Sequence, residues 1–218
     1  MEVRLAERRA KRGTRSGSAA APGDAPPDVA AAAIAAAMRL FADQGWAGVT
    51  LADIARAADL PFAALHGVFT SKAAVLRGFL DGVDRAVLAA APEEGASVRE
   101  ALFELMMRRF DALQPHRAAL RRLAGDLPRD PAAAACIALR GLRSIAAIAE
   151  RAGVETGGPL GGLRVKALAG LQAWVSRIWL ADDSADMART MKALDSGLAR
   201  LEAVARGFPG PRTHRAAA

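Results

Sequence analysis

The sequence lacks tyrosine altogether, and aromatic residues make up only 5% of its 218 positions. It also lacks runs of β-branched residues and stretches in which apolar and polar residues alternate, so no segment is typical of a β-strand. Alanine is abundant, and alanine is the strongest helix former. Because 52% of the residues are hydrophobic, the chain can bury a substantial core. We therefore predict an all-α protein.

Residues that carry catalysis or bind metals are scarce. Cys136 is the single cysteine, which excludes an internal disulfide. The three histidines, His66, His116 and His214, are scattered, and no pair of histidine or cysteine residues has metal-ligand spacing. No glycine-rich loop lies between a strand and a helix, which argues against a nucleotide phosphate site. We expect no enzyme activity, no metal and no cofactor.

Long apolar runs are missing as well. No segment of about 18 apolar residues is free of charge, so we expect no integral membrane association. The basic N-terminus is not followed by the apolar region of a secretory signal, and two acidic residues among the first seven argue against an organellar transit peptide. A cytoplasmic protein is the expectation.

Acidic residues are fewer than basic ones, and the excess of basic residues is concentrated at the N-terminus. The net charge is +7 and the pI is about 10.8, which favours a polyanionic partner such as nucleic acid or an anionic membrane surface. Residues 1–15 contain six basic and two acidic side chains. They are interpreted either as an arm that lies along a DNA groove or as a solvated tail. Residues 16–27, rich in alanine, glycine and proline, are expected to form a disordered linker, and residues 207–218 a disordered tail.

The stretch from Thr50 to Lys72 predicts two short helices joined by a tight turn, followed by the start of a third helix. Thr50 is suited to cap the first helix, and Asp53 lies in its first turn, where a carboxylate suits the helix dipole. Pro61 disfavours helical geometry in the residue before it but is tolerated in the first turn of the next helix. Two helices joined in this way are the smallest unit that presents one helix to the DNA major groove. We predict that Phe62, Leu65, Val68 and Phe69 form the apolar side of the second helix.

Residues 28 to about 90 resemble the N-terminal domain of TetR-type transcriptional regulators. The matching positions keep the order and spacing of that family without a gap: Leu40-Phe41-Ala42, Gly45-Trp46, Val49-Thr50, Asp53-Ile54-Ala55, Ala58, Leu65, Phe69, Ser71-Lys72 and Leu76. The resemblance implies a three-helix helix-turn-helix head over residues 28–90. It also implies a ligand-binding and dimerisation domain over residues 91–206, with about nine helices in the whole chain.

The resemblance implies a role for each position of the motif. The helix Pro61–Val68 would be the recognition helix for a double-stranded DNA operator. Lys72, beside a helix N-terminus, would contact a backbone phosphate. Bidentate readout of bases uses Arg, Lys, Asn or Gln, and this helix contains none, so apolar contact with thymine methyl groups is the direct readout left open. The implied DNA-binding residues are Thr50, Pro61, Phe62, Ala63, His66 and Lys72.

The second half of the chain predicts further helices. A long helix over Leu163–Ala181 is apolar on most sides and has to be buried by several neighbours. Methionine and aromatic side chains adapt to apolar ligands, and TetR-like proteins bind a small effector among these helices. The candidate lining of an apolar effector pocket is Met106, Met107, Phe110, Trp174 and Trp179, although ordinary core packing is the better explanation for any one of these residues alone.

The last helix, predicted over Ser184–Arg206, contains apolar residues at alternating spacings of four and three, which is a heptad-like seam. The family resemblance favours a homodimer in which the two final helices of each subunit form a four-helix bundle, and packing within one chain is the alternative. The seam consists of Met187, Met191, Leu194, Leu198 and Leu201.

A second resemblance covers fewer than thirty residues. Trp179-Leu180, Asp182-Asp183-Ser184, Thr190 and Leu194-Asp195 are similar to the C-terminal region of the ubiquinone-biosynthesis accessory proteins, which share the TetR-like fold and bind lipids and isoprenoid quinones. Locally, residues 182–184 are expected to form a loop and an N-cap. Two functions thus remain open. The first is a TetR-type DNA-binding regulator, with repression as the usual activity of the family, and the second is a lipid- or quinone-binding accessory protein without specific DNA binding.

Overall fold

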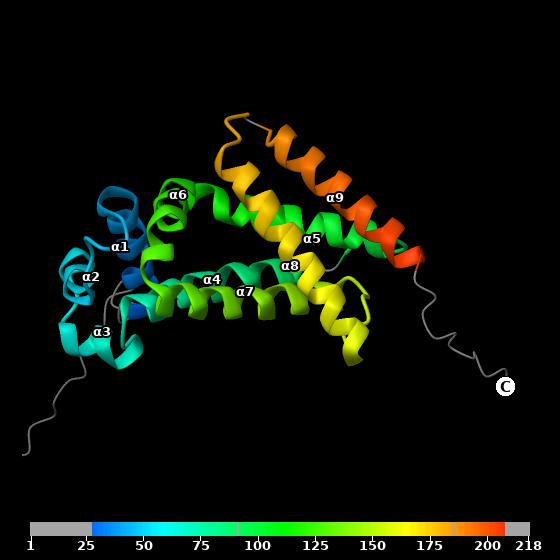
Figure 1. Cartoon of the computed structure of the whole chain (residues 1–218). Helices are drawn as coiled ribbons and strands as arrows, with labels where there is room; N and C mark the ends of the chain where they lie inside the picture. The colour runs from blue at the N-terminus through cyan, green and yellow to red at the C-terminus, as the bar shows by residue number, and fades with distance from the viewer. Residues whose placement is uncertain (1–27, 91, 185, 208–218) are drawn as a thin grey trace, which may run out of the picture.

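The computed structural model describes residues 28–90, 92–184 and 186–207, and within these ranges the protein consists of nine α-helices and two short 3-10 helices, with no strand. This confirms the predicted all-α fold. The first three helices form a small head at one end, and the remaining helices form an elongated body (Figure 1). The predicted arm and linker over residues 1–27, and the predicted tail from residue 208 onward, lie outside the described residues.

The head contains α1 (Val29–Gln44), α2 (Leu51–Ala57) and α3 (Phe62–Val68). Asp28 begins α1 by accepting hydrogen bonds from the backbone N–H groups of Ala30 and Ala31, at 3.1 and 3.2 Å. The three helices bury a compact apolar core between them, formed chiefly by Phe41, Trp46, Val49, Ile54 and Leu65.

Helix α4 (Lys72–Ala89) joins the head to the body and packs on α1, α5 and α7. Ser71 caps α4 by accepting a hydrogen bond from the N–H group of Ala74 at 3.1 Å. Helix α5 (Val98–Leu113) begins with a capping box, in which Ser97 and Glu100 each accept the other's backbone N–H. Both signals could be recognised from the sequence because the capping residues lie only three positions apart.

The rest of the body consists of α6 (Arg117–Asp126), α7 (Pro131–Arg151), α8 (Gly158–Leu180) and α9 (Ala188–Gly207). The 3-10 helices Gln114–His116 and Leu127–Arg129 flank α6. Helix α6 packs against α1 in the head, and Arg121 on α6 donates to the carbonyl of Leu180 at the C-terminal end of α8. A cation suits that end of a helix, so α6 fixes the end of α8.

Two predicted helix starts are wrong. Helix α8 begins at Gly158, five residues before the predicted Leu163, because Pro159 is compatible with the first turn of a helix. Helix α9 begins at Ala188 and not at Ser184. Asp182 explains this delay: its carboxylate accepts hydrogen bonds from Ser184 and from the N–H and Oγ1 of Thr190, at 2.9 and 2.7 Å for the latter two. The intervening segment therefore loops around the carboxylate, with Met187 at a φ of 53°.

Helix α7 is, by length and composition alone, apolar enough to cross a membrane, and 28% of its most apolar stretch is buried in the protein. It contains Arg140, whose guanidinium is paired with Asp81 and Asp84 on α4. Such pairing and its packing on α4 and α8 are typical of a helix that belongs to the body of the protein.

A buried polar cluster holds α4, α5 and α7 together. Asp84 on α4 accepts from the guanidinium of Arg109 on α5 and from Ser144 Oγ on α7, the latter at 2.8 Å. Ser144 Oγ in turn accepts from Arg109 at 2.9 Å, and Arg140 pairs with the second oxygen of Asp84. Asp84, Arg109 and Ser144 are each less than 9% exposed. Burial lowers the pKa of Arg109 from its ordinary value, and the neighbouring Asp84 carboxylate opposes that shift.

Candidate functional site

The predicted helix-turn-helix is formed by α2, the turn at residues 58–61, and α3. Thr50 Oγ1 accepts from the N–H of Asp53 at 3.2 Å, and the Asp53 carboxylate accepts from the Thr50 N–H at 3.0 Å. The Thr50 hydroxyl also donates to the Asp53 carboxylate at 2.6 Å, and this bond, together with the one from the Thr50 N–H, lowers the pKa of Asp53. Asp59 lies in the turn at a φ of 54°, which redirects the chain so that Pro61 can precede α3. Local sequence signals thus determine the position of α3 relative to α2.

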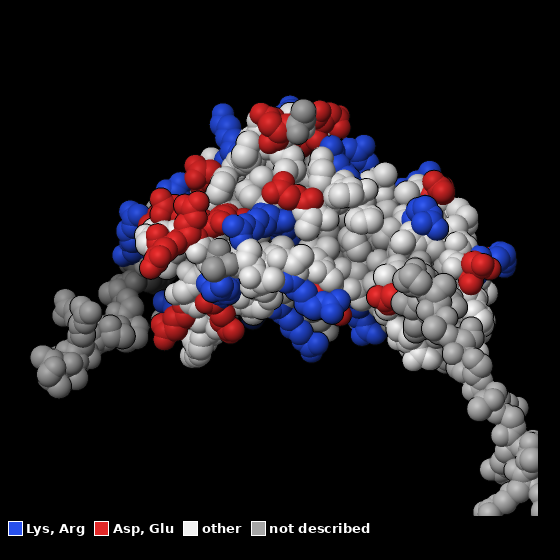
Figure 2. Space-filling view, turned by 180° about the vertical axis from the view of Figure 1, so that it is seen from behind, with Lys and Arg blue, Asp and Glu red and all other residues white. Residues whose placement is uncertain are grey.

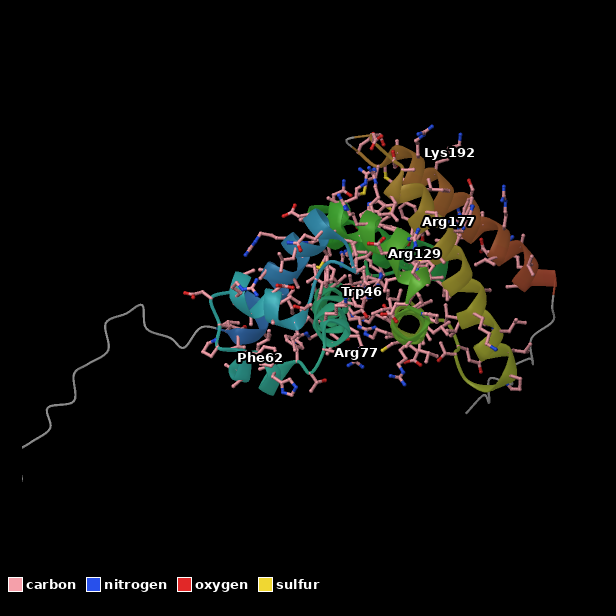
Figure 3. All side chains as sticks on the ribbon, turned by 60° about the vertical axis from the view of Figure 1, so that its left-hand side comes forward. Trp46, Phe62, Arg77, Arg129, Arg177 and Lys192 are labelled. Carbon is pink, nitrogen blue, oxygen red and sulfur yellow. The ribbon has the colours of Figure 1, made fainter. Side chains whose placement is uncertain are left out.

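Helix α3 is exposed over nearly its whole surface. Leu65 is its one buried residue, and Pro61, Ala63, Ala64, His66 and Gly67 are exposed. Phe62 and Val68 are each 50% exposed and Phe69 is half-buried, so neighbouring helices cover only part of the apolar side predicted for this helix. Figure 3 shows Phe62 at the outer edge of the head, on α3.

Four of the six predicted DNA-binding residues share this outward surface of α3. His66 lies beside Phe62, with ring centroids 5.9 Å apart, and no carboxylate of the described residues pairs with it. Thr50 is also exposed, although its hydroxyl is committed to Asp53. The surface that α3 offers consists of Pro61, Phe62, Ala63 and His66. It is apolar except for His66, whose imidazole is its one side-chain hydrogen-bond donor.

Lys72 is placed differently from the expectation of a phosphate contact. Its ammonium donates to the backbone carbonyls of Trp46 and Val49, at 2.6 and 2.9 Å, and lies 4.6 Å from the centroid of the Trp46 ring. Burial lowers the pKa of Lys72, and the nearby Asp130 carboxylate opposes that shift. Two of the three ammonium protons thus tie α4 to the loop between α1 and α2, so Lys72→Ala would disturb the head as well as remove a charge.

Trp46 connects this loop to the body, a role that no signal in the sequence indicates. Its backbone N–H donates to Asp126 at 2.9 Å, and its indole Nε1–H donates to Asp130 at 3.0 Å. The side chain is only 4% exposed, and its hydrogen bond lowers the pKa of Asp130. The preceding Gly45 has a φ of +73°, and a Cβ there would collide with Asp126. The two carboxylates follow Trp46 by about 80 residues, so no local pattern could have revealed the contact.

The described head has no excess of positive charge. Residues 28–78 contain four acidic and four basic side chains. The chain's charge excess is located mainly at its ends: residues 1–27 contain six basic and three acidic residues, and residues 208–218 contain two basic and none acidic. Five of the seven net positive charges therefore lie outside the described residues, and phosphate attraction by the head alone is weak.

The five candidate effector-pocket residues do not line one cavity. Met106, Phe110 and Trp179 are core residues, each at most 2% exposed, and Trp179 Nε1 donates to Gln114 at 2.8 Å. Met107 is half-buried beside them. Trp174 is 45% exposed and lines an open hollow of about 460 Å³ between α8 and α9, away from the other four. Ordinary packing therefore accounts for the buried members of this set.

The predicted seam on α9 faces the protein's own core. Met187, Leu194 and Leu198 are buried and Met191 and Leu201 are half-buried, since α9 packs on α8 and α5. The close approach of α8 is visible at Gly197, where a Cβ would lie 2.2 Å from Leu171 Cδ1. Packing within the chain, the alternative interpretation, thus explains the seam, and these five residues do not form an open face for a partner.

An open apolar face lies on α8 instead. We define the α8 stripe as the four residues Leu163, Ala167, Gly170 and Trp174. Their spacings of four, three and four place them along one side of the helix. Leu163 is 63% exposed and Gly170 is exposed, while Ala167 is half-buried. The sequence predicts that α8 is apolar on several sides, but the periodicity of its apolar residues does not indicate which side a neighbour covers.

The comparisons with known proteins agree with this geometry. Residues 33–78 match the family model described as "Bacterial regulatory proteins, tetR family". Among solved structures, the TetR transcriptional regulator from Nitrosomonas europaea is 20% identical, with a TM-score of 0.66, over 79% of this chain and 97% of that one. GusR from Salmonella enterica is 21% identical, with a TM-score of 0.56, over 81% and 96% of the two chains. No curated protein sequence matches the chain.

Proposed function

We propose that this chain is a TetR-family DNA-binding transcriptional regulator and that α3 reads its operator, since residues 33–78 match the tetR family model and the described residues have the TetR-like fold. The exposure of α3 on all sides except Leu65 supports this role. A helix that lies in the major groove has to be free of intramolecular cover. We further propose repression as the mode of action, a small apolar or amphipathic effector as the signal, and the cytoplasm as the location.

The chemistry of α3 determines how it reads bases. Phe62 and Ala63 can contact thymine methyl groups, and His66 can donate to a phosphate or to a base acceptor. Such contacts discriminate less than a bidentate arginine, so sequence-dependent DNA shape contributes a large part of the specificity. The described head adds little net charge, and the basic residues 1–27 supply the electrostatic attraction in this proposal.

Ala63→Glu tests α3 as the recognition helix. We expect at least about 100-fold weaker binding to DNA from upstream of the protein's own gene, because a like charge placed against phosphates costs several kcal/mol. Ala63 lies in the first turn of α3, where glutamate is compatible with the helix, so the fold is retained. Footprinting and fluorescence anisotropy at several salt concentrations measure the effect. The matched control, Ala86→Glu on the exposed side of α4, should bind as wild type, and equal loss in both variants would refute the assignment.

Two copies of α3 are needed for a palindromic operator, and we propose that the α8 stripe forms the dimer interface. Leu163, Gly170 and Trp174 offer an exposed apolar surface with one small residue at its centre, which permits close approach of a second helix. The hollow beside Trp174, lined by Arg177, Ile178 and Arg189 as well, extends this surface toward α9. Dimerisation there would place two α3 helices on half-sites about 34 Å apart.

Leu163→Glu is expected to convert the dimer into a folded monomer, because a charge would be buried within an apolar interface. Analytical ultracentrifugation measures the mass, and circular dichroism verifies that helix content is unchanged. Val98→Glu introduces the same charge at an exposed valine on α5 and should leave the dimer intact. A dimer that persists in Leu163→Glu would exclude the α8 stripe as the interface.

No observation favours the quinone-binding alternative. The segment that resembles the ubiquinone-biosynthesis accessory proteins is explained by Asp182, which is buried and accepts hydrogen bonds from Ser184 and Thr190. The shared residues thus build the turn between α8 and α9, and this turn requires them whatever the protein binds.

A further inference from the structure

A groove of about 840 Å³ runs along the surface between α4 and α7 and reaches the C-terminal end of α3. Val68 and Phe69 form its end at the head, and the facing sides of α4 and α7 form its walls. None of the predicted DNA, effector or dimer residues lines it. Its volume is within the range of about 300 to 1,000 Å³ that is typical of sites for small molecules.

Three arginines without carboxylate partners line this groove. Arg77 and Arg85 on α4 and Arg143 on α7 are exposed, and none of the carboxylates in the described residues lies within 4.0 Å of their guanidinium groups. The two aspartates of the groove, Asp81 and Asp84, are already paired with Arg140 and Arg109. Figure 3 shows Arg77 at the lower edge of the molecule, and basic side chains also project from the lower edge in Figure 2. The groove thus has an uncompensated positive charge.

The remaining lining is apolar. Leu88 on α4, Leu139 on α7 and Phe69 contribute side chains, and Leu139 is 60% exposed. Gly78 narrows α4 at this point, because a Cβ there would lie 2.8 Å from the Phe69 ring. Arginines above an apolar surface complement a molecule that carries an anionic head and a hydrocarbon body. A nucleic-acid backbone, with phosphates and no hydrocarbon, would leave the apolar surface uncovered.

We propose that the groove between α4 and α7 binds an amphipathic anion, with its carboxylate or phosphate head on Arg77, Arg85 and Arg143 and its hydrocarbon body against Leu88, Leu139 and Phe69. The inference rests on the proposed function, because it assigns a place and a chemical class to the effector. It differs from the sequence-based expectation, which placed an apolar effector among Met106, Phe110 and the tryptophans.

The position of the groove explains how such a ligand would act on DNA binding. Val68 is the last residue of α3, and Phe69 follows it directly and contacts Gly78 on α4. A ligand wedged between α4 and α7 would therefore change the contact that holds the end of α3 on α4. An effector shifts an equilibrium only through its different affinity for two conformations, and coupling free energies of this kind correspond to about 5- to 150-fold changes in affinity.

The test uses the full-length protein and dodecanoate below its critical micelle concentration, with calorimetry as the readout. We expect saturable binding of one dodecanoate molecule per chain. Dodecanol and acetate should bind at least about tenfold more weakly, because dodecanol lacks the anionic head and acetate lacks the hydrocarbon body. Arg85→Gln combined with Arg143→Gln should weaken dodecanoate at least about tenfold, as should Leu139→Asp. Dodecyl phosphate, compared in the same way, identifies the preferred head. Arg151→Gln, an exposed arginine on α7 outside the groove, should change nothing.

DNA binding without any amphiphile is measured on the same proteins. Dodecanoate that binds wild type and the double variant equally, or that binds neither, would overturn the site while leaving the operator assignment untouched. Loss of DNA binding by the double variant without dodecanoate binding would assign the arginines to DNA phosphates and would also overturn it. Arginine-dependent dodecanoate binding by a protein that recognises no operator would support the site and refute the proposed regulation through it.

Discussion

Replacing Asp84 with alanine is expected to lower the free energy of unfolding by about 3–5 kcal/mol. The carboxylate is the common acceptor for Arg109, Arg140 and Ser144, which come from two other helices. Its removal leaves the buried guanidinium of Arg109 with Ser144 Oγ as its remaining partner. An unpaired buried charge costs far more than the pair itself contributes, so the loss would be large even if the intact cluster is close to neutral in stability.

Asp81→Ala is the matched control, because Asp81 lies one turn away on α4, is paired with the same Arg140 and is exposed. Its cost should stay below about 1 kcal/mol, as is usual for exposed ion pairs. Urea denaturation followed by circular dichroism measures both variants. Joint replacement of Asp84 by Leu and Arg109 by Met should recover much of the loss, since no charge is then left buried. Equal costs for Asp81→Ala and Asp84→Ala would contradict the proposed burial effect.

Trp46→Ala should cost a similar amount, about 3–5 kcal/mol, for a different reason. The indole fills the space between Phe41, its ring neighbour at 5.5 Å, and the ammonium of Lys72, and alanine would leave a cavity there. It would also remove the indole Nε1–H that donates to Asp130, whereas the hydrogen bond from the backbone N–H to Asp126 does not depend on the side chain. Lost packing at the junction of head and body therefore accounts for most of the expected destabilisation.

Trp46→Phe separates the packing of Trp46 from its hydrogen bond. Phenylalanine retains most of the apolar contact and lacks the Nε1–H donor, so we expect a loss of about 1 kcal/mol. Thermal and urea unfolding give the stabilities, and hydrogen exchange locates the change. Protection should fall in α1, α6 and the loop between α1 and α2 together. A loss of protection confined to the head would show that the contact does not connect the two parts.

Local chemistry made most of the fold predictable. Thr50, Ser71 and Ser97 each cap a helix through an N–H group three residues away, so the signal and the structure lie within one turn. The start of α9 was misplaced because its cause, the bond from Thr190 to Asp182, spans eight residues and competes with the serine that resembles a cap. Periodicity gives the faces of a helix, whereas a turn stabilised by a buried carboxylate has no periodicity.

The candidate sites were harder to predict for a related reason. The spacing of Leu194 and Leu198 shows that α9 has an apolar side, but a partner subunit and the chain's own α8 would require the same spacing. Lys72 was correctly found beside a helix N-terminus, yet its length and charge are equally suited to two carbonyls that lie more than twenty residues earlier. The arginines of the α4–α7 groove come from two helices, so only the folded chain brings Arg143 into the same groove as Arg77 and Arg85.

The bonds of Trp46 have a consequence for the evolution of the chain by exchange of domains. The head ends with α3 at Val68, but the carboxylates that hold its first loop, Asp126 and Asp130, belong to the body. A head transplanted onto a foreign body would keep α3 and lose the partners that orient it. The orientation of α3 relative to the body therefore depends on residues of both parts, and exchange of either part alone would weaken this contact.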